Sequence, residues 1–307
     1  MEIIKLAQLT GVYEGTYRDQ QYHGQGKFWY GYNGKDNRLV YEGAWHNGLK
    51  HGRGKETYAN GDQYDGEWQN GLIHGTGKMT YSNGDVYDGE WQIEIKHGTG
   101  MMTYSNGDVY EGDWQKDKKH GTGKMTYSNG DGKLWGAFLS GSKASVYEGE
   151  WLNDIRHGAG KLTFTNGCVW EGNRQNGQPH GKSRITMPDG GVEEVGEYEN
   201  GYAHGKVITT YPDGRVDEEE WQYGKPHGKY TSTYPDGRVE EGEWNNGRLH
   251  GKWRTTYPDG RVQEEEYQNG EPCWNRKWKI TYPGGRVEKG KYQYGELQGK
   301  RRTTHSD

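Results

Sequence analysis

Histidine is the residue that this sequence places most regularly where it could do chemistry. Of the 12 histidines, those followed by glycine recur about every 23 residues: His23, His51, His74, His97, His120, His157, His180, His204, His227 and His250. A zinc site needs several imidazole nitrogens about 2 Å from one ion. If each repeat is a two-stranded hairpin, histidines one repeat apart lie about 10 Å apart. We therefore expect these histidines to hydrogen-bond the hairpin turns, and we expect no metal site.

Carboxylate runs and one glycine-containing loop are the other candidates for chemistry. The runs "DEEEW" and "EEGEW" recur with the repeat, whereas a catalytic pair of carboxylates occurs once, in a pocket. The stretch "NGQPHGKS" (176–183) resembles a phosphate-binding loop, but Asn176 replaces its first glycine and no helix follows. We therefore expect no catalytic residues, no cofactor and no enzymatic activity.

Composition limits the classes of protein further. The chain has 307 residues, a mean hydropathy of -1.27 and a formal charge of -5, and no basic stripe that would favour binding to nucleic acid. Its 13 Trp, 25 Tyr and 53 Gly argue against disorder, because disordered chains are poor in aromatic residues. Cys168 and Cys273 match no disulfide or zinc spacing. We expect a soluble intracellular chain with two reduced thiols, since the N-terminal "MEIIKLAQLTG" does not resemble a signal peptide.

One stretch of sequence is repeated along the chain. "HGTGKMTYSNGDVYDGEWQ" begins at His74 and returns at His97 with three changes. The underlying frame is Y-x-G-x-W, a turn, H-G-x-G-x-x-x-Y and a second turn. About twelve units begin at Tyr13, Tyr41, Tyr64, Tyr87, Tyr110, Tyr147, Trp170, Glu194, Asp217, Glu240, Gln263 and Glu288. Such a period indicates a repeat architecture.

Each unit is predicted to be a β-hairpin. Its side chains alternate along two strands, and Asn-Gly, which tolerates positive φ in tight turns, separates them. Alternation places Tyr64, Gly66 and Trp68 on one face, whereas Asp65 and Glu67 lie on the other with Lys and Thr opposite. Aromatic rings would therefore lie over glycines and stack from repeat to repeat, with one side of each ring left open to solvent.

We expect an all-β fold: an elongated, twisted, mostly single-layer antiparallel sheet of about twelve 23-residue hairpins, on the order of 115 Å long. Residues 1–12 would be an N-terminal cap segment. Residues 13–172 would contain typical repeats, with an insertion at about 131–146. Residues 173–307 would contain divergent repeats that continue the sheet, because large or acidic residues replace several of the framework glycines and tyrosines there.

The segments "YEGAWHNGLKHGRGKETYANGDQY" (41–64) and "YDGEWQNGLIHGTGKMTYSNGDVY" (64–87) resemble MORN (membrane occupation and recognition nexus) repeats, and the resemblance extends over almost the whole chain. It implies a non-enzymatic scaffold in a large assembly. Pure MORN arrays of this kind occur in the radial-spoke heads of cilia and flagella, so the resemblance implies an axonemal component of the cytoskeleton. Its partners would be other proteins, including another MORN protein or a second copy.

Two alternatives remain open. The first is a peripheral membrane or phosphoinositide-binding module; the negative net charge and the lack of a polybasic patch count against it. The second is a regulatory subunit of a separate enzyme.

The aromatic face is the predicted partner-binding site, because Tyr and Trp are enriched in binding hot spots. Its residues are Tyr41, Trp45, Tyr64, Trp68, Tyr81, Tyr87, Trp91, Tyr104, Tyr110, Trp114, Tyr147, Trp151 and Trp170. The insertion is the second candidate. Its "LWGAF" stretch is too apolar for an idle loop, so we predict a docking loop that contains Leu134, Trp135 and Phe138.

Overall fold

The computed structural model describes residues 3–8, 11–30, 38–129, 143–268, 270–272, 277–293 and 296–304. The described residues form β-strands and turns, with no α-helix among them. The chain divides into two compact units, which are treated separately: unit 1 comprises residues 1–131 and 145–157, and unit 2 comprises residues 132–144 and 158–307. The predicted change from typical to divergent repeats at Asn173 therefore does not coincide with the boundary between the units.

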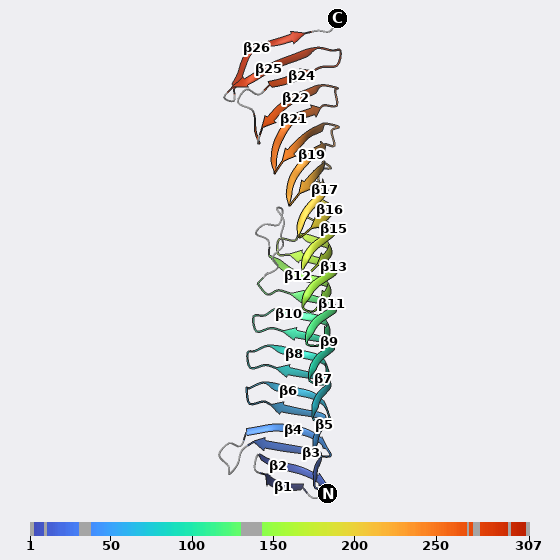
Figure 1. The fold of residues 1–307 in the computed structure, drawn as a ribbon, viewed down its shortest axis with the longest axis vertical. Helices are drawn as coiled ribbons and strands as arrows, with labels where there is room; N and C mark the ends of the chain where they lie inside the picture. The colour runs from blue at the N-terminus through green and yellow to red at the C-terminus, as the bar shows by residue number, and fades with distance from the viewer. Residues whose placement is uncertain are drawn as a thin grey trace. The chain divides into compact units, whose positions relative to one another are not determined.

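Unit 1 is an open antiparallel sheet of successive hairpins (Figure 1). Its strands are β1 (Ile3–Gln8), β2 (Gly11–Arg18), β3 (Gln21–Tyr30), β4 (Arg38–His46), β5 (Leu49–Thr57), β6 (Gln63–Gln69), β7 (Leu72–Thr80), β8 (Val86–Gln92), β9 (Ile95–Thr103), β10 (Val109–Gln115), β11 (Lys118–Thr126) and β12 (Ala144–Leu152). β13 (Ile155–Phe164) crosses the boundary in sequence.

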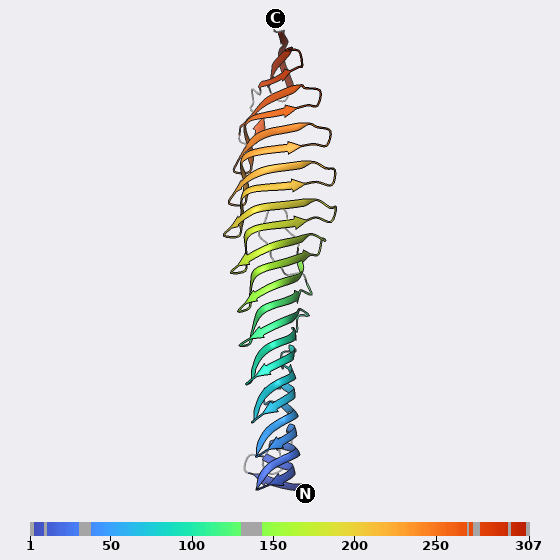
Figure 2. The same ribbon diagram turned by 90° about the vertical axis from the view of Figure 1, so that its right-hand side faces the viewer.

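Unit 2 continues the same hairpin pattern, and Figure 2 shows its hairpins following one another in chain order. Its further strands are β14 (Val169–Gln175), β15 (Gln178–Thr186), β16 (Val192–Glu199), β17 (Tyr202–Thr210), β18 (Val216–Gln222), β19 (Lys225–Thr233), β20 (Val239–Asn245), β21 (Arg248–Thr256), β22 (Val262–Gln268), β23 (Glu271–Pro272), β24 (Lys277–Thr281), β25 (Val287–Gln293) and β26 (Glu296–Thr304). The predicted all-β fold of antiparallel hairpin repeats is confirmed.

The tight turn of each hairpin follows from its central dipeptide. Asn70 and Gly71 join β6 to β7 with φ values of 52° and 88°, the left-handed conformation that Asn and Gly accept at lowest cost. Across this hairpin Gly66 pairs with Gly77, and after a β-bulge Trp68 pairs with Ile73. The same register shift recurs in the next hairpin, between Gly89 and Trp91.

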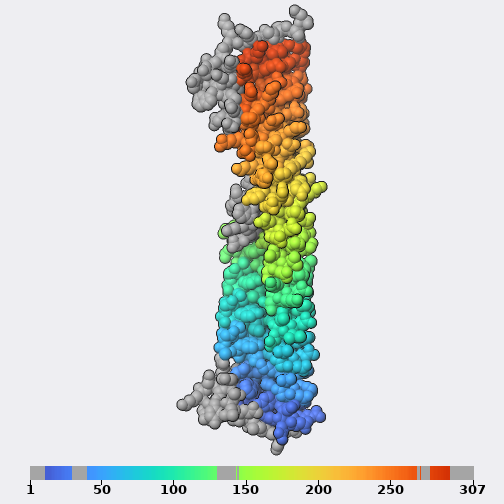
Figure 3. Space-filling view, in the orientation of Figure 1, coloured from blue at the N-terminus to red at the C-terminus, as the bar shows by residue number. Residues whose placement is uncertain are grey.

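The core of unit 1 lies on one face of its sheet, called here the inner face. It consists of the framework tyrosines and tryptophans with Met79, Met102 and Met125, all buried. The opposite, outer face carries ion pairs such as Lys27–Glu42 at 2.8 Å and Lys124–Glu148 at 3.1 Å. The predicted division between an aromatic face and a charged face is confirmed. In Figure 3 the bands of colour of unit 1 follow chain order without interleaving, as expected of repeats that contact only their neighbours.

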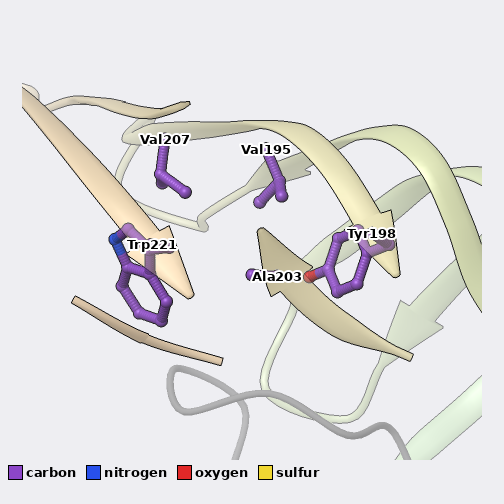
Figure 4. Close-up of a cluster of buried hydrophobic side chains, with 5 residues drawn as sticks. All are labelled: Val195, Tyr198, Ala203, Val207 and Trp221. Carbon is purple, nitrogen blue, oxygen red and sulfur yellow. The ribbon is translucent and has the colours of Figure 1, made fainter. Parts of the chain in front are cut away.

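Unit 2 fills its inner face differently. Val207, Tyr230 and Trp278, which replace the second glycine of H-G-x-G, are buried. Figure 4 shows one resulting cluster, in which Val195 and Tyr198 project from β16 toward Ala203 on the next strand, with Val207 and Trp221 beside them. Large side chains here replace the glycine floor of unit 1, as the sequence predicted.

One framework position of unit 2 differs from the prediction. Glu193, not Glu194, takes the inner-face position of the framework tyrosine, since Glu193 is buried and Glu194 is exposed. Glu193 pairs with Ile185 across the strands, as Trp170 does in the preceding repeat. The extra residue lies later, at the bulge between Val195 and Glu197.

Candidate functional site

The rings of five framework tyrosines of unit 1 each lie flat over two glycines: Tyr13, Tyr41, Tyr64, Tyr87 and Tyr110. In the third repeat, any Cβ atom added at Gly66 or Gly77 would overlap the Tyr64 ring. The Tyr64 hydroxyl donates a hydrogen bond of 3.0 Å to the carbonyl oxygen of Glu67. The ring is fully buried, and this burial raises the pKa of its hydroxyl. Tyr64 is therefore part of the core of its own hairpin.

The framework tryptophan joins one repeat to the next. The Nε1 atom of Trp91 donates a hydrogen bond of 3.0 Å to the carbonyl oxygen of Gly77 in the preceding repeat. Its indole packs edge-on against two rings, that of Tyr64 with centroids 5.7 Å apart and that of Tyr87 at 5.0 Å. Edge-to-face pairs of this kind contribute about 0.5–1.5 kcal/mol beyond their buried area. Trp68 and Trp114 repeat both contacts.

Most of the predicted partner-binding rings are buried, so the expectation that one side of each ring stays open to solvent is wrong for them. The buried rings are Tyr41, Trp45, Tyr64, Trp68, Tyr87, Trp91, Tyr110, Trp114, Tyr147, Trp151 and Trp170. Glycines lie beneath Tyr41, Tyr64, Tyr87 and Tyr110, and tryptophans of the same and the next repeat pack against the edges of each ring. Little of these rings is therefore open to a partner in this structure, and their role as partner contacts stays a prediction. Tyr81 and Tyr104 are half-buried, and their role as partner contacts stays a prediction.

A lysine covers the remaining face of the framework rings. The Nζ atom of Lys96 lies 5.0 Å from the Trp114 ring centroid, 5.6 Å from that of Tyr87 and 5.7 Å from that of Tyr81. An ammonium at such distances is attracted by the negative ring faces. Burial lowers the pKa of Lys96, although Asp117, Asp154 and Asp85 oppose that effect. Among the described residues no carboxylate forms an ion pair with Lys96.

The same position carries a cation in most repeats of unit 1. Lys119 lies 5.4 Å from the Tyr104 and Tyr110 ring centroids and 5.1 Å from that of Trp151. Arg156 lies over Tyr127 and Tyr147 and donates a hydrogen bond to the Tyr127 hydroxyl. We call these three cations, with the half-buried Tyr81, Tyr104 and Tyr127, the cation–tyrosine row.

Sequence reasoning missed these cations, although a signal was present. From the second to the sixth repeat, the residue before the His-Gly pair is Lys50, Ile73, Lys96, Lys119 and then Arg156. Alternation puts this residue on the same face as the glycines. Lys50 lies over the Tyr41 and Trp68 rings in the same way, but unlike Lys96 and Lys119 it also pairs with the buried Glu56, so it is not counted in the row. Ile73 stands at the equivalent position and is 3% exposed. The space beside the rings that the lysine side chains fill, called here the slot, is therefore apolar.

The long loops at one edge of unit 1 are joined by aspartates. The Oδ1 atom of Asp85 accepts a hydrogen bond of 2.7 Å from the backbone N–H of Ser105 in the next repeat, and Asp62 does the same for Ser82. These backbone bonds lower the pKa of both carboxyls. They hold Tyr81 and Tyr104, which begin the loops, in a fixed relation to their neighbours.

The tight turns form the opposite edge, and several of them depart from Asn-Gly, two with a large hydrophobic or aromatic residue at the first position. Ile93 has a φ of 50° and is 58% exposed, and Tyr223 in unit 2 has a φ of 49° and is 71% exposed. A residue other than glycine in this region is strained by about 1–2 kcal/mol, and a β-branched residue such as Ile93 is a marked outlier. Exposed leucine or isoleucine side chains flank Ile93: Leu49, Leu72 and Ile95.

Unit 2 places acidic groups where unit 1 has tyrosines. Glu193 is 4% exposed, and its burial raises the pKa to about 7, with Glu219 adding to the effect. In the later repeats arginines stack on loop tyrosines. The guanidinium carbon of Arg238 lies 3.7 Å from the Tyr234 ring centroid, and its Nη1 atom lies 3.4 Å from Glu240. The inner face of unit 2 is therefore chemically distinct from that of unit 1.

The histidines do not all behave as predicted. The Nδ1 atom of His227 accepts a hydrogen bond of 3.4 Å from the N–H of Asn246 in a tight turn, as predicted. The buried Nδ1 atoms of His23, His51, His120 and His204 have no hydrogen-bond partner among the described residues, so through this atom these four do not bond the turns. Backbone atoms tie each tight turn to the preceding repeat instead, as in the bond of 2.8 Å from the Gly71 N–H to the Lys50 carbonyl. No group of three or more His, Cys, Asp or Glu side chains in the described part of the chain could hold a metal ion.

Several sequence expectations fall on other segments. Leu134, Trp135 and Phe138, the predicted docking loop, lie outside the described residues, as does Cys273. Cys168 is a buried free thiol. A membrane-spanning helix would have to be long and apolar, and the residues described contain none.

Comparison with known proteins identifies the repeat. The family model for the MORN repeat matches residues 13–31, 41–63, 64–86, 87–109, 110–132, 147–169, 170–192, 195–214, 220–237 and 241–260. No curated protein matches the chain. Among solved structures, the TCP domain of SAS-4 (dCPAP) from Drosophila melanogaster, in complex with a proline-rich motif of Ana2 (dSTIL), is 14% identical. The match covers 70% of this chain and 89% of that one, with a TM-score of 0.25, too low to support any inference. The matched segments account for most of the sequence, and the chain belongs to the MORN repeat family.

Proposed function

We propose that this chain is a non-enzymatic scaffold whose unit 1 binds a protein partner along the cation–tyrosine row. MORN repeats are interaction modules, which supports the general role. The row supports the site. It is the part of the inner face that remains accessible after the framework rings are buried, and it presents the same groups in successive repeats.

The chemistry of the row suits protein contact. Tyr81 and Tyr104 each keep part of the ring exposed, and tyrosine is enriched where interfaces are tightly packed. Lys96 and Lys119 are partly desolvated without an ion pair among the described residues. Both ammonium groups have lost part of their hydration in the free protein, which costs free energy. A carboxylate or carbonyl oxygen of a partner would offset that desolvation cost by bonding to them.

The proposed assembly is a ciliary or flagellar axoneme, with a position like that of a radial-spoke-head protein. This part of the proposal rests on resemblance to pure MORN arrays in such heads. The partners would be other proteins of the assembly, including another MORN protein or a second copy, and the location would be the cytoskeleton. A regular array suits this role because adding repeats extends the surface without changing it.

The test uses photo-crosslinking in ciliated cells. Tyr104 is replaced by a photo-crosslinkable phenylalanine derivative, which keeps a ring at that position, and Lys124 on the outer face is replaced in a matched variant. We expect irradiation to join the Tyr104 variant to specific axonemal proteins after detergent extraction, and the Lys124 variant to give far less product. Equal crosslinking from both positions would refute the proposed site. Loss of the protein with the detergent-soluble fraction would refute the axonemal location.

The peripheral membrane alternative predicts a different result. Flotation with vesicles containing phosphatidylserine and phosphoinositide would then carry the protein upward, and added salt would release it. We expect no flotation, because the chain carries a formal charge of -5 and aspartates lie near both Lys96 and Lys119. Strong, salt-sensitive flotation would favour the membrane function over the scaffold.

A further inference from the structure

The tight-turn edge of unit 1 carries a second surface, separate from the cation–tyrosine row. Leu49, Leu72, Ile93 and Ile95 come from three consecutive turns, and each is an exposed large hydrophobic residue. We call them the apolar ridge. The turns are hydrogen-bonded to their neighbours, since Glu94 N–H donates to the Ile73 carbonyl at 3.0 Å. The ridge is therefore a fixed line of side chains rather than a set of independent loops.

Ile93 shows that folding alone does not explain the ridge. The equivalent residues of the two preceding turns are Asn47 and Asn70, with φ values of 49° and 52°. Ile93 adopts the same conformation, which β-branched residues disfavour, and is more than half exposed. An asparagine here would relieve the strain and remove apolar surface from water. Strained residues of this kind cluster at functional positions.

Charge continues the ridge at the next turn. Lys116 and Lys118 are both exposed, and neither forms an ion pair among the described residues. The acidic residues at these turns are Glu94 and Asp117, and one carboxylate oxygen of Asp117 already accepts a hydrogen bond of 2.9 Å from the Lys96 N–H. The edge thus presents apolar groups at three turns and, at the fourth, two exposed lysines that form no ion pair among the described residues.

The spacing of the turns selects the secondary structure of the partner. Consecutive turns are two strands apart, about 9.6 Å. Seven residues of an α-helix advance about 10.5 Å and return to nearly the same face. An extended strand returns to the same face every two residues, about 6.7 Å, and so falls out of step at once. A helix with a heptad pattern fits the ridge with about 1 Å of drift per turn.

We propose that the apolar ridge binds an amphipathic helix of a partner protein. The helix would place apolar side chains, one heptad apart, against the turns of Leu49, Leu72 and Ile93–Ile95. Carboxylates one heptad further on would face Lys116 and Lys118. A membrane surface is the less favoured occupant, because two lysines fall short of the cluster of about four to eight that anionic lipid binding requires.

The first test uses the full chain and a synthetic helical peptide. The peptide has leucine at every seventh residue over three heptads and a glutamate-bearing heptad at each end, so that either helix direction can engage the lysines. Fluorescence anisotropy measures its affinity. We expect saturable binding that falls at least tenfold in Ile93→Asn. Because this change relieves backbone strain, the same variant should melt at a higher temperature than the parent chain.

A variant that binds more weakly yet melts at a higher temperature has lost a contact with the peptide and has not lost its fold. Tyr223→Asn is the matched control: it makes the same kind of change at a turn of unit 2 and should leave peptide affinity unaltered. Unchanged affinity in Ile93→Asn, or no saturable binding to the parent chain, would overturn the proposal. These results bear on the ridge alone, since the crosslinking from Tyr104 reports separately on the cation–tyrosine row.

The second test addresses charge. The double variant Lys116→Glu/Lys118→Glu should bind the glutamate peptide at least tenfold more weakly, and a peptide with lysine in place of those glutamates should recover the affinity. If the lysine peptide does not bind the double variant with recovered affinity, the assigned contact between the peptide carboxylates and Lys116 and Lys118 is refuted. Vesicles of phosphatidylcholine and phosphatidylserine provide the remaining arm. Ile93-dependent vesicle binding without peptide binding would assign the ridge to a membrane instead.

Discussion

The indole of Trp91 packs edge-on against the phenol ring of Tyr64, which belongs to the preceding repeat, with ring planes at 86° and centroids 5.7 Å apart. Trp91 also donates its Nε1 hydrogen to the Gly77 carbonyl beneath that ring. One side chain thus supplies both a ring contact and a hydrogen bond between neighbouring repeats. The recurrence of this arrangement explains how a chain with so few aliphatic residues forms a core.

Shortening Trp91 should separate its two contributions. We expect Trp91→Phe to lower the free energy of unfolding by about 1–3 kcal/mol, because the Gly77 carbonyl loses its donor and part of the ring contact is lost. Trp91→Ala should cost about 3–5 kcal/mol. Urea denaturation followed by circular dichroism measures both. Equal losses in the two variants would show that the ring itself contributes little.

Gly77 should tolerate no side chain, since a Cβ atom there would overlap the Tyr64 ring. We expect Gly77→Ala to destabilise unit 1 by at least about 2 kcal/mol, in the range of strongly overpacked cores. Lys78→Ala, the next residue along β7 on the outer face, is the control and should cost less than about 1 kcal/mol. Thermal unfolding compares them, and similar melting temperatures would contradict the proposed ring position.

Glu193 should make unit 2 less stable as the pH rises. Its pKa is raised from 4.5 to about 7 in the folded protein, so the folded state holds a proton that the unfolded state releases. The free energy of unfolding should therefore fall between about pH 4.5 and 7 and level off above, by on the order of 3 kcal/mol at most. The charged or titratable groups around it include Arg174, Tyr198 and Glu219.

Glu193→Gln isolates this effect, because an amide keeps the shape and cannot ionise. At pH 8 the variant should be more stable than the parent chain, and the difference should shrink toward pH 4.5. Urea titrations at a series of pH values give the comparison. A variant whose stability keeps the pH dependence of the parent chain would rule out Glu193 as its source.

Lys96 should be replaceable by isoleucine, because Ile73 occupies the same slot one repeat earlier. Burial lowers the pKa of Lys96, so the charged form costs stability at every pH below that pKa. We expect Lys96→Ile to keep or raise the melting temperature at pH 7, with the gain disappearing once the parent lysine is neutral at high pH. A large loss of stability at pH 7 would mean that the cation–ring contacts outweigh desolvation.

The sequence by itself determined the hairpin repeats, their period and the two faces of the sheet. These features are local: Asn70 and Gly71 fix a turn, and alternation from Tyr64 to Trp68 fixes which side chains share a face. The replacement of the glycine floor by Val207 and Tyr230 could also be read directly from the register.

Only the tertiary structure decided which rings remain accessible. Within its own hairpin Tyr87 has Lys96 over its ring, but the remaining open edge is covered only by Trp114 of the next repeat. The exposure of a side chain depends on atoms from neighbouring repeats, which local alternation does not place. The same reason explains why the strain and exposure of Ile93, in a turn that looks ordinary by position, became apparent only when its backbone conformation and surroundings were known.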